Sequence, residues 1–211
     1  MHEPEKNLRQ LVADEAARLV YDEGYRDYRL AKLKAAQRLG ADQAKNQPSN
    51  EEIEQALFDY VQLLDPAEQA ERVQQHRQIA LEALEFLQDF QPYLTGMALD
   101  GTSGPLSAIT LHLSANRAED VIFFLEDKHI PFQIHERKVS SGKKQELFPL
   151  LRFYVDNVEV ELMIFPDDGR TAHNALHPMT GRGVRRADYK RVQELVAKGT
   201  ANRLSADPRV S

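Results

Sequence analysis

The sequence predicts an α+β protein in which a helical N-terminal domain precedes a mixed or antiparallel sheet with flanking helices. Two observations lead to this prediction. Before Phe90, apolar residues recur at the spacing of amphipathic helices. After Pro92, apolar and polar residues alternate, which is typical of half-buried strands. We therefore expect a helical domain over residues 1–78, an α/β domain over 79–199 and a flexible tail over 200–211.

Four helices are expected in the N-terminal part, because each apolar face is bounded by a start or stop signal. Gly24 and Gly40 end the first two helices. Ser49 and Glu52 have the spacing of a capping box at the third, and Pro66 suits the first turn of the fourth. The expected spans are 8–23, 27–39, 50–64 and 66–90.

The C-terminal part is expected to contain five strands and two helices. A Gly/Pro-rich turn at 101–105 joins the first two strands, and Asp156-Asn157 forms a tight hairpin between the last two. Asn116 with Glu119 caps the first of these helices, and Gly199 ends the second. The strands are expected at 93–100, 106–114, 131–139, 146–155 and 158–165.

Composition limits the classes of function. The formal net charge of −6 is unfavourable for a dedicated duplex-DNA-binding protein, which usually presents a basic surface. The absence of cysteine excludes disulfides, thiolate metal sites and a cysteine nucleophile. The N-terminus lacks the apolar core of a signal peptide, and no apolar run approaches the ~18 residues of a membrane span. We therefore expect a cytoplasmic protein without membrane association.

The most informative motif begins at Gly96-Met97, and Ala108-Ile109-Thr110 follows it on a predicted strand. This layout resembles the signature of the DNA polymerase β-like nucleotidyltransferase superfamily, in which a Gly-Ser turn precedes Asp-x-Asp on a strand. Met97 takes the place of the serine, and Ala108 and Thr110 take the places of the aspartates. The likeness covers residues 80–197. Two N-terminal segments are also similar to those of an uncharacterised bacterial nucleotidyltransferase-like family: 29–40 and 48–53.

The resemblance implies a nucleotidyltransferase-like fold without the groups that run the reaction. Nucleotidyl transfer uses two divalent cations held by carboxylates and substrate phosphates. Ala108 and Thr110 supply no anionic ligand. The family's third acidic position maps to Glu161, because an apolar run begins directly after it. The resemblance thus marks five vestigial site positions: Gly96, Met97, Ala108, Thr110 and Glu161.

A metal site of another kind is an alternative. His112 is expected on the same strand face as Ala108 and Thr110, and Glu159 shares a face with Glu161. An imidazole beside carboxylates suits Zn²⁺ or Mn²⁺ better than Mg²⁺. The competing interpretation is a hydrogen-bonded structural histidine and two solvated glutamates on a half-exposed strand.

Two basic segments are candidate anion-binding surfaces. In the loop 170–186, Arg182, Arg185 and Arg186 are expected to contact phosphate, because guanidinium groups bind it bidentately. The alternative is a solvent-exposed loop that nearby aspartates partly neutralise. The charges around the second helix are spread about its axis, which favours a solvated surface over a nucleic-acid contact: Arg26, Arg29, Lys32, Lys34 and Arg38.

We therefore expect a catalytically degenerate nucleotidyltransferase-like protein that binds a nucleotide or other phosphate ligand, a nucleic acid, or a protein partner through its N-terminal helices. One alternative is an active nucleotidyltransferase whose non-standard metal site uses Glu159 and Glu161 with Asp100 or His112. Another alternative is an interaction scaffold that binds no small ligand. No cofactor is expected, and Mg²⁺ or Mn²⁺ would be needed only by an active enzyme.

Overall fold

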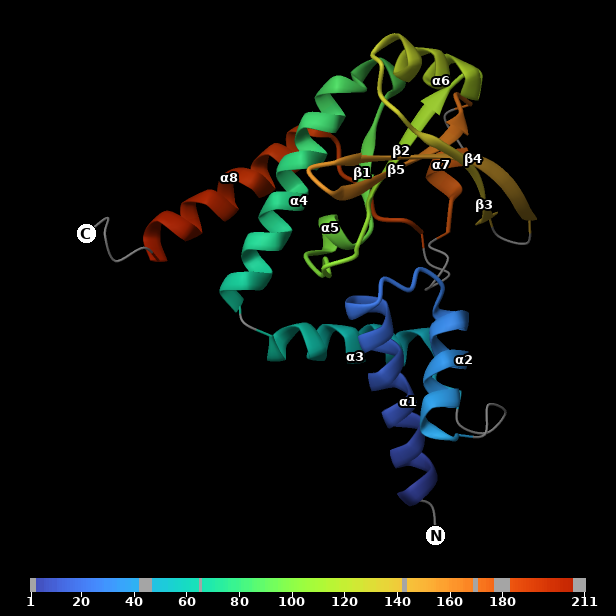
Figure 1. Ribbon diagram of the computed structural model, residues 1–211, viewed down its shortest axis with the longest axis vertical. Coiled ribbons are helices and arrows are strands. Elements are labelled where there is room, and N and C mark those ends of the chain that lie inside the picture. The colour runs from blue at the N-terminus through green and yellow to red at the C-terminus, as the bar shows by residue number, and fades with distance from the viewer. Residues whose placement is uncertain are drawn as a thin grey trace.

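The computed structural model describes residues 3–41, 47–64, 66–141, 144–168, 171–176 and 183–206 (Figure 1). It is an α+β structure in which helices flank a five-stranded mixed sheet. The helices are α1 Glu3–Asp22, α2 Tyr28–Leu39, α3 Asn50–Leu63, α4 Pro66–Phe86, η1 Gln88–Phe90 (a 3-10 helix), α5 Met97–Asp100, α6 Ala118–Asp127, α7 Thr171–Asn174 and α8 Tyr189–Ala206. The strands are β1 Tyr93–Thr95, β2 Ile109–Ala115, β3 Gln133–Ser141, β4 Lys144–Val155 and β5 Val158–Pro166.

The first three helices share one hydrophobic core at one end of the molecule (Figure 1). Asp27 caps α2, because its Oδ1 accepts a hydrogen bond from the Arg29 N–H at 2.7 Å. Gly40 ends α2 in the left-handed conformation, and the capping box of Ser49 and Glu52 is present at α3. The predicted signals at Gly40 and at Ser49 with Glu52 are confirmed, whereas the cap at Asp27 was not predicted. The largest fully buried side chains of this core are those of Leu19 and Ile53.

The fourth helix, α4, runs from this helical region along the sheet without a break (Figure 1). It ends at Phe86 and not, as predicted, at Phe90. Gln91 has a positive φ of 47°, and the three residues of η1 lead into this turn. The apolar pattern alone does not show this change of backbone conformation.

The expected domain boundary between residues 78 and 79 lies inside α4, so no linker separates the two parts at that point. The boundary between two hydrophobic clusters lies close to this position. The buried residues of the first cluster end at Val61, and those of the second begin at Ile79. The tail expected from residue 200 begins inside α8, and residues 207–211 lie outside the described part of the chain. Among the described residues, no helix combines the length and apolar character needed to cross a bilayer.

The sheet has the strand order β1-β2-β5-β4-β3. Strands β2 and β5 are parallel, and the other neighbours are antiparallel. Ile109, Leu111 and Leu113 point into a core shared with α4, α6 and α8, which confirms the alternation predicted for this strand. The opposite face of β2 carries Thr110 and His112, and this polar face of the sheet holds the candidate site.

Residues 93–100 do not form the single strand that was expected. β1 ends at Thr95, because Gly96 adopts φ 70° and ψ −153°, a conformation that side chains disfavour. The chain then turns into α5, where the Ala98 carbonyl accepts a hydrogen bond from Arg77 Nε of α4 at 3.0 Å. The predicted strand is therefore wrong beyond Thr95.

Two helix boundaries also differ from the prediction. Asn116 does not cap α6, which begins one residue later with Arg117 at the N-cap position. Gly199 does not end α8, which continues past it. A side chain at this position would collide with Gln74 of α4, whose Nε2 donates to the Val196 carbonyl at 2.8 Å. Gly199 therefore lies within α8, beside the flexible end of the Gln74 side chain, rather than ending the helix.

The end of α1 packs against the loop 101–108 that precedes β2. Gly104 is buried where this loop passes the backbone of Tyr21, and a Cβ on Gly104 would overlap the Tyr21 carbonyl. The Tyr21 hydroxyl donates to Gln69 of α4, whose Nε2 donates to the Ser103 carbonyl at 3.2 Å. These contacts hold the N-terminal helices against the part of the chain that lines the site.

Replacing Gly104 by alanine is expected to lower the free energy of unfolding by about 1–3 kcal/mol, because the added methyl group is forced against backbone atoms. The matched control is Gly183→Ala, since a Cβ there has no atom within 4 Å. Urea denaturation of the two variants and the wild type measures the difference. Equal unfolding midpoints for both variants would contradict the close approach of the loop to α1.

Candidate functional site

A cavity of about 130 Å³ lies between the end of α1 and the polar face of the sheet. Residues of α1 and of the loop that follows it, including Gly24 and Arg26, form part of its lining. Six positions selected from the sequence also line it: Gly96, Met97, Ala108, Thr110, His112 and Glu161. The fold therefore brings the residues of the suspected motif together in one place.

Strand pairing explains how β2 and β5 contribute. In the parallel register Thr110 lies opposite Glu161, and His112 lies opposite Met163. Because side chains alternate along a strand, these four share the face that is turned away from the main core. His112 is buried, and its ring centroid lies 4.9 Å from that of Phe165. The histidine is thus packed against an aromatic ring at the cavity floor.

A serine from outside the motif lies beside Met97. The Ser107 hydroxyl donates to Met97 Sδ at 3.4 Å and accepts from the Gly104 N–H at 2.8 Å. Ser107 therefore places its hydroxyl on the cavity wall, close to the position where the resemblance expects a serine. The sequence interpretation missed this residue, because it lies ten positions away in the chain.

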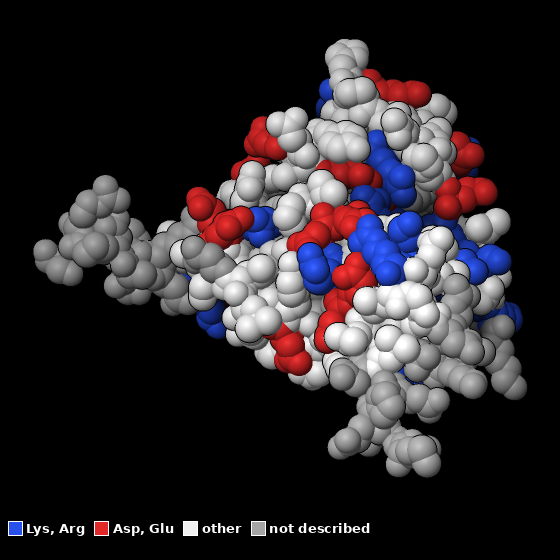
Figure 2. Space-filling view, turned by 60° about the horizontal axis from the view of Figure 1, so that its bottom comes forward, with Lys and Arg blue, Asp and Glu red and all other residues white. Residues whose placement is uncertain are grey.

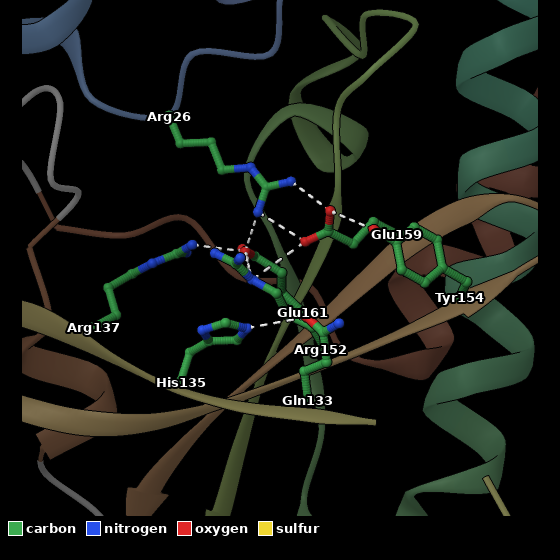
Figure 3. A network of polar contacts seen from close by, with 8 residues as sticks. All are labelled: Arg26, Gln133, His135, Arg137, Arg152, Tyr154, Glu159 and Glu161. Atoms are coloured by element: carbon green, nitrogen blue, oxygen red, sulfur yellow. Dashed lines mark hydrogen bonds and ion pairs between the residues drawn. The ribbon is translucent and has the colours of Figure 1, made fainter. Parts of the chain in front are cut away.

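Glu161 is the most constrained charge of the site, because its side chain is only 1% exposed. Its Oε1 accepts hydrogen bonds from three guanidinium groups (Figure 3). Arg137 Nη2 of β3 lies at 2.7 Å and Arg152 Nε of β4 at 3.0 Å, while Arg26 reaches it from the loop between α1 and α2. A carboxylate in this environment is neutralised by arginines rather than presented to a metal ion.

Glu159 completes the same cluster. Arg26 binds it bidentately, with Nη1 2.9 Å from Oε1 and Nη2 2.8 Å from Oε2. Hydrogen bonding from Arg26 lowers the pKa of Glu159, although burial opposes this shift. The same bond raises the pKa of Arg26. Arg152 Nε lies 3.3 Å from Glu159 Oε1, so two of the three arginines contact both carboxylates.

The cluster has a surplus of positive charge. Three guanidinium groups face two carboxylates, which leaves one cation in excess. Arg26 and Arg137 also line the cavity, where Glu161 is the only carboxylate among the described lining residues. A partly enclosed space with this charge favours anions over cations. The effective dielectric constant is lower there than in water, which strengthens the electrostatic potential of the arginines.

The candidate metal ligands are not arranged as a metal site. His112 and Glu161 line the cavity, but Glu159 is bound by Arg26, and Asp100 Oδ1 accepts from Arg185 Nη1 at 2.8 Å. The described residues contain no group of three or more His, Cys, Asp or Glu side chains that could hold a metal ion. The geometry thus gives no support to the metal-site alternative.

The basic loop does not converge on the cavity in the described residues. Arg185 is 76% exposed and pairs with Asp100. The Arg186 guanidinium lies over the Tyr93 ring at 4.7 Å from its centroid, and burial lowers the pKa of Arg186. Neither arginine is among the described residues that line the cavity. Arg182, the third expected phosphate contact, lies outside the described residues.

Two of the basic residues of α2, Lys32 and Arg38, are paired with neighbouring groups. Arg38 forms ion pairs with Glu15 and Glu23, and Lys32 Nζ donates to Asn50 Oδ1 at 2.7 Å. Figure 2 shows Lys and Arg side chains interspersed with Asp and Glu across the centre of one face. This pattern agrees with a solvated surface on the face shown rather than with a continuous stripe for nucleic acid.

Two arginines around Glu161, Arg137 and Arg152, were not selected from the sequence, and Arg26 was assigned to a solvated surface although it binds Glu159 and Glu161. A signal for Arg152 is present in the sequence. Asp156 and Asn157, with φ of 49° and 64°, form the predicted tight hairpin, and counting back from it places Arg152 opposite Glu161. Comparable short-range signals for Arg26 and Arg137 are lacking, because tertiary packing brings them to the site.

Comparison with known proteins adds no assignment to this geometry. No family model, no curated protein and no solved structure matches this chain. The functional argument therefore depends on the residues of the site.

Glu161→Gln is expected to lower the free energy of unfolding by about 3 kcal/mol, because it removes the buried carboxylate shared by three guanidinium groups and leaves Arg137 without its ion pair. Glu159→Gln is the matched control, with an expected loss of about 1 kcal/mol, since this side chain is more exposed and meets fewer arginines. Chemical denaturation at neutral pH measures both losses. A larger loss in Glu159→Gln than in Glu161→Gln would contradict the central role of Glu161.

The stabilising effect of Glu159 is expected to depend on pH. Its folded-state pKa lies below the ordinary value, so its contribution is present above the unfolded pKa of about 4.3 and is lost as pH falls through the folded pKa. The stability difference between the wild type and Glu159→Gln should therefore be largest near neutral pH and shrink below about pH 4. Unfolding experiments from pH 7 to pH 3 test this, and a constant difference would show that Arg26 does not stabilise the carboxylate.

Proposed function

We propose that this chain is a catalytically degenerate nucleotidyltransferase-like protein that binds an anionic ligand in the cavity and transfers no nucleotidyl group. The observation that supports this most is the state of Glu161. At the position where the resemblance expects a metal-binding carboxylate, this residue is buried and binds three arginines. The neighbouring motif positions, Ala108 and Thr110, line the cavity without a negative charge.

The chemistry of nucleotidyl transfer explains why this arrangement argues against catalysis. The reaction needs two divalent cations that stabilise the attacking and leaving oxygens. Mg²⁺ is held in such sites by carboxylates and substrate phosphates. Here Glu161 is the one motif position that carries a carboxylate, and a cation near it would also face the guanidinium groups of Arg26, Arg137 and Arg152.

The same groups support anion binding. A guanidinium carries five N–H donors in a planar fork that matches carboxylate and phosphate oxygens. Among the contacts between described residues, Arg137 donates to Glu161 through Nη2, so most of its donors point elsewhere. Its partial burial at the cavity lining strengthens an interaction with a bound anion.

The first test of this proposal is a nucleotidyltransferase assay. With any of the four ribonucleoside triphosphates and Mg²⁺ or Mn²⁺, we expect no release of pyrophosphate above that of an Ala108→Phe variant, whose ring fills the cavity. Metal-dependent release by the wild type alone would overturn the proposed loss of catalysis and would favour the active-enzyme alternative.

The second test concerns the anion. Inorganic phosphate should raise the melting temperature of the wild type by mass action and should raise that of Arg137→Gln less. Phosphate also stabilises proteins by exclusion from their surface, so the difference between variants is the measure. Arg185→Gln is the control, because Arg185 pairs with Asp100 away from the cavity lining. Equal shifts in all three proteins would remove the cavity from consideration as an anion site.

A further inference from the structure

We infer that the anion taken by this cavity is a small organic acid: a single carboxylate or phosphate head on an apolar body no larger than about one ring. This inference rests on the proposed anion-binding function and names the class of ligand for the same site. It follows from the size of the cavity, from the change of polarity along its floor, and from the surplus charge at one part of its wall.

The size of the cavity limits the ligand. At about 130 Å³ it is close to the ~150 Å³ of an apolar protein cavity that accepts benzene. Sites for drug-sized ligands enclose roughly 300–1,000 Å³. A nucleoside triphosphate, which joins a base, a sugar and three phosphates, is larger than this space, so much of it would lie outside the cavity. The ligand is therefore compact.

The floor of the cavity changes from charged to apolar within one strand. Glu161 and Met163 follow one another on the same face of β5, so they are separated by about 7 Å. Glu161 lies in the arginine cluster, whereas Met163 belongs to an apolar cluster with Phe165 and Ala175. A ligand that covers both must carry a charged end and an apolar end within one small molecule.

The apolar part of the wall comes from several segments. The apolar lining residues are Val20 of α1, Met97 of α5, Leu106 of the loop before β2, and Met163 and Val184. The flexible thioethers of the two methionines adapt to the outline of a bound group. An inorganic ion alone would leave these side chains uncovered, so it would gain nothing from them.

The charged part of the wall selects the head group. Arg26 and Arg137 line the cavity at the cluster that has one cation in excess. A carboxylate or phosphate head placed beside Arg137 would balance this excess through charge-assisted hydrogen bonds. A neutral molecule of the same outline would leave the excess uncompensated, which favours the acid over its neutral analogue.

The test uses isothermal titration calorimetry with benzoate and phenyl phosphate, and with benzamide, inorganic phosphate and ATP as comparisons. We expect at least one of the two organic acids to bind at least tenfold more tightly than benzamide, inorganic phosphate and ATP. Arg137→Gln should weaken this binding at least tenfold, and Ala108→Phe should abolish it. Arg185→Gln should leave it unchanged. Ala108→Leu replaces the phenylalanine variant if circular dichroism shows that the latter is unfolded.

The outcomes separate this inference from the proposed function. If phosphate stabilises the protein through Arg137 but neither organic acid binds more tightly than phosphate, the ligand class is wrong and anion binding stands. Binding of ATP more tightly than both organic acids, again through Arg137, would replace the small acid by a nucleotide. If no anion responds to the loss of Arg137, both proposals fail. Binding of benzamide as tightly as benzoate would overturn the assigned role of the charge.

Discussion

A single carboxylate oxygen, Oε1 of Glu161, joins three parts of the chain. It accepts hydrogen bonds from Arg26 in the loop after α1, from Arg137 on the edge strand β3 and from Arg152 on β4. A buried carboxylate is tolerated only when it is paired and hydrogen-bonded, so the positions of all three arginines are constrained at once. The walls of the cavity depend on this constraint, because Arg26 fixes the N-terminal loop over the sheet.

The contrast between the two faces of the sheet explains how one small domain carries both a stable core and a polar site. On one face the side chains of β2, β5 and β4 are apolar and pack against α4, α6 and α8. On the other face the same strands present Thr110, Glu161 and Arg152. The period of two along each strand separates these roles, so the sheet itself forms the floor of the site.

The parts of the fold that could be predicted are those with local causes. The caps at Gly40 and Ser49, the alternation of β2 and the hairpin at Asp156-Asn157 all follow from neighbouring residues. Ala108, Thr110 and Glu161 line one cavity, and the resemblance had already marked these three positions as parts of one site. The arginine partners from the first loop and from β3 could not be predicted, because no local pattern records a contact across the molecule. The outcomes at Gly96 and Gly199 differ from the prediction, because the chain leaves β1 at the first and α8 continues through the second.

The contacts of Arg26 with Glu159 and Glu161 span 133 and 135 residues, which has a consequence for the order in which the molecule forms. Closing so long a loop has an entropic cost that must be met before the contact stabilises anything, so such contacts form late. The β4–β5 hairpin pairs residues that are close in the chain, whereas the contact of α1 with α3 between Arg9 and Glu52 spans 43 residues. We therefore expect the hairpin to form first and the cavity to be completed last, when Arg26 meets β5.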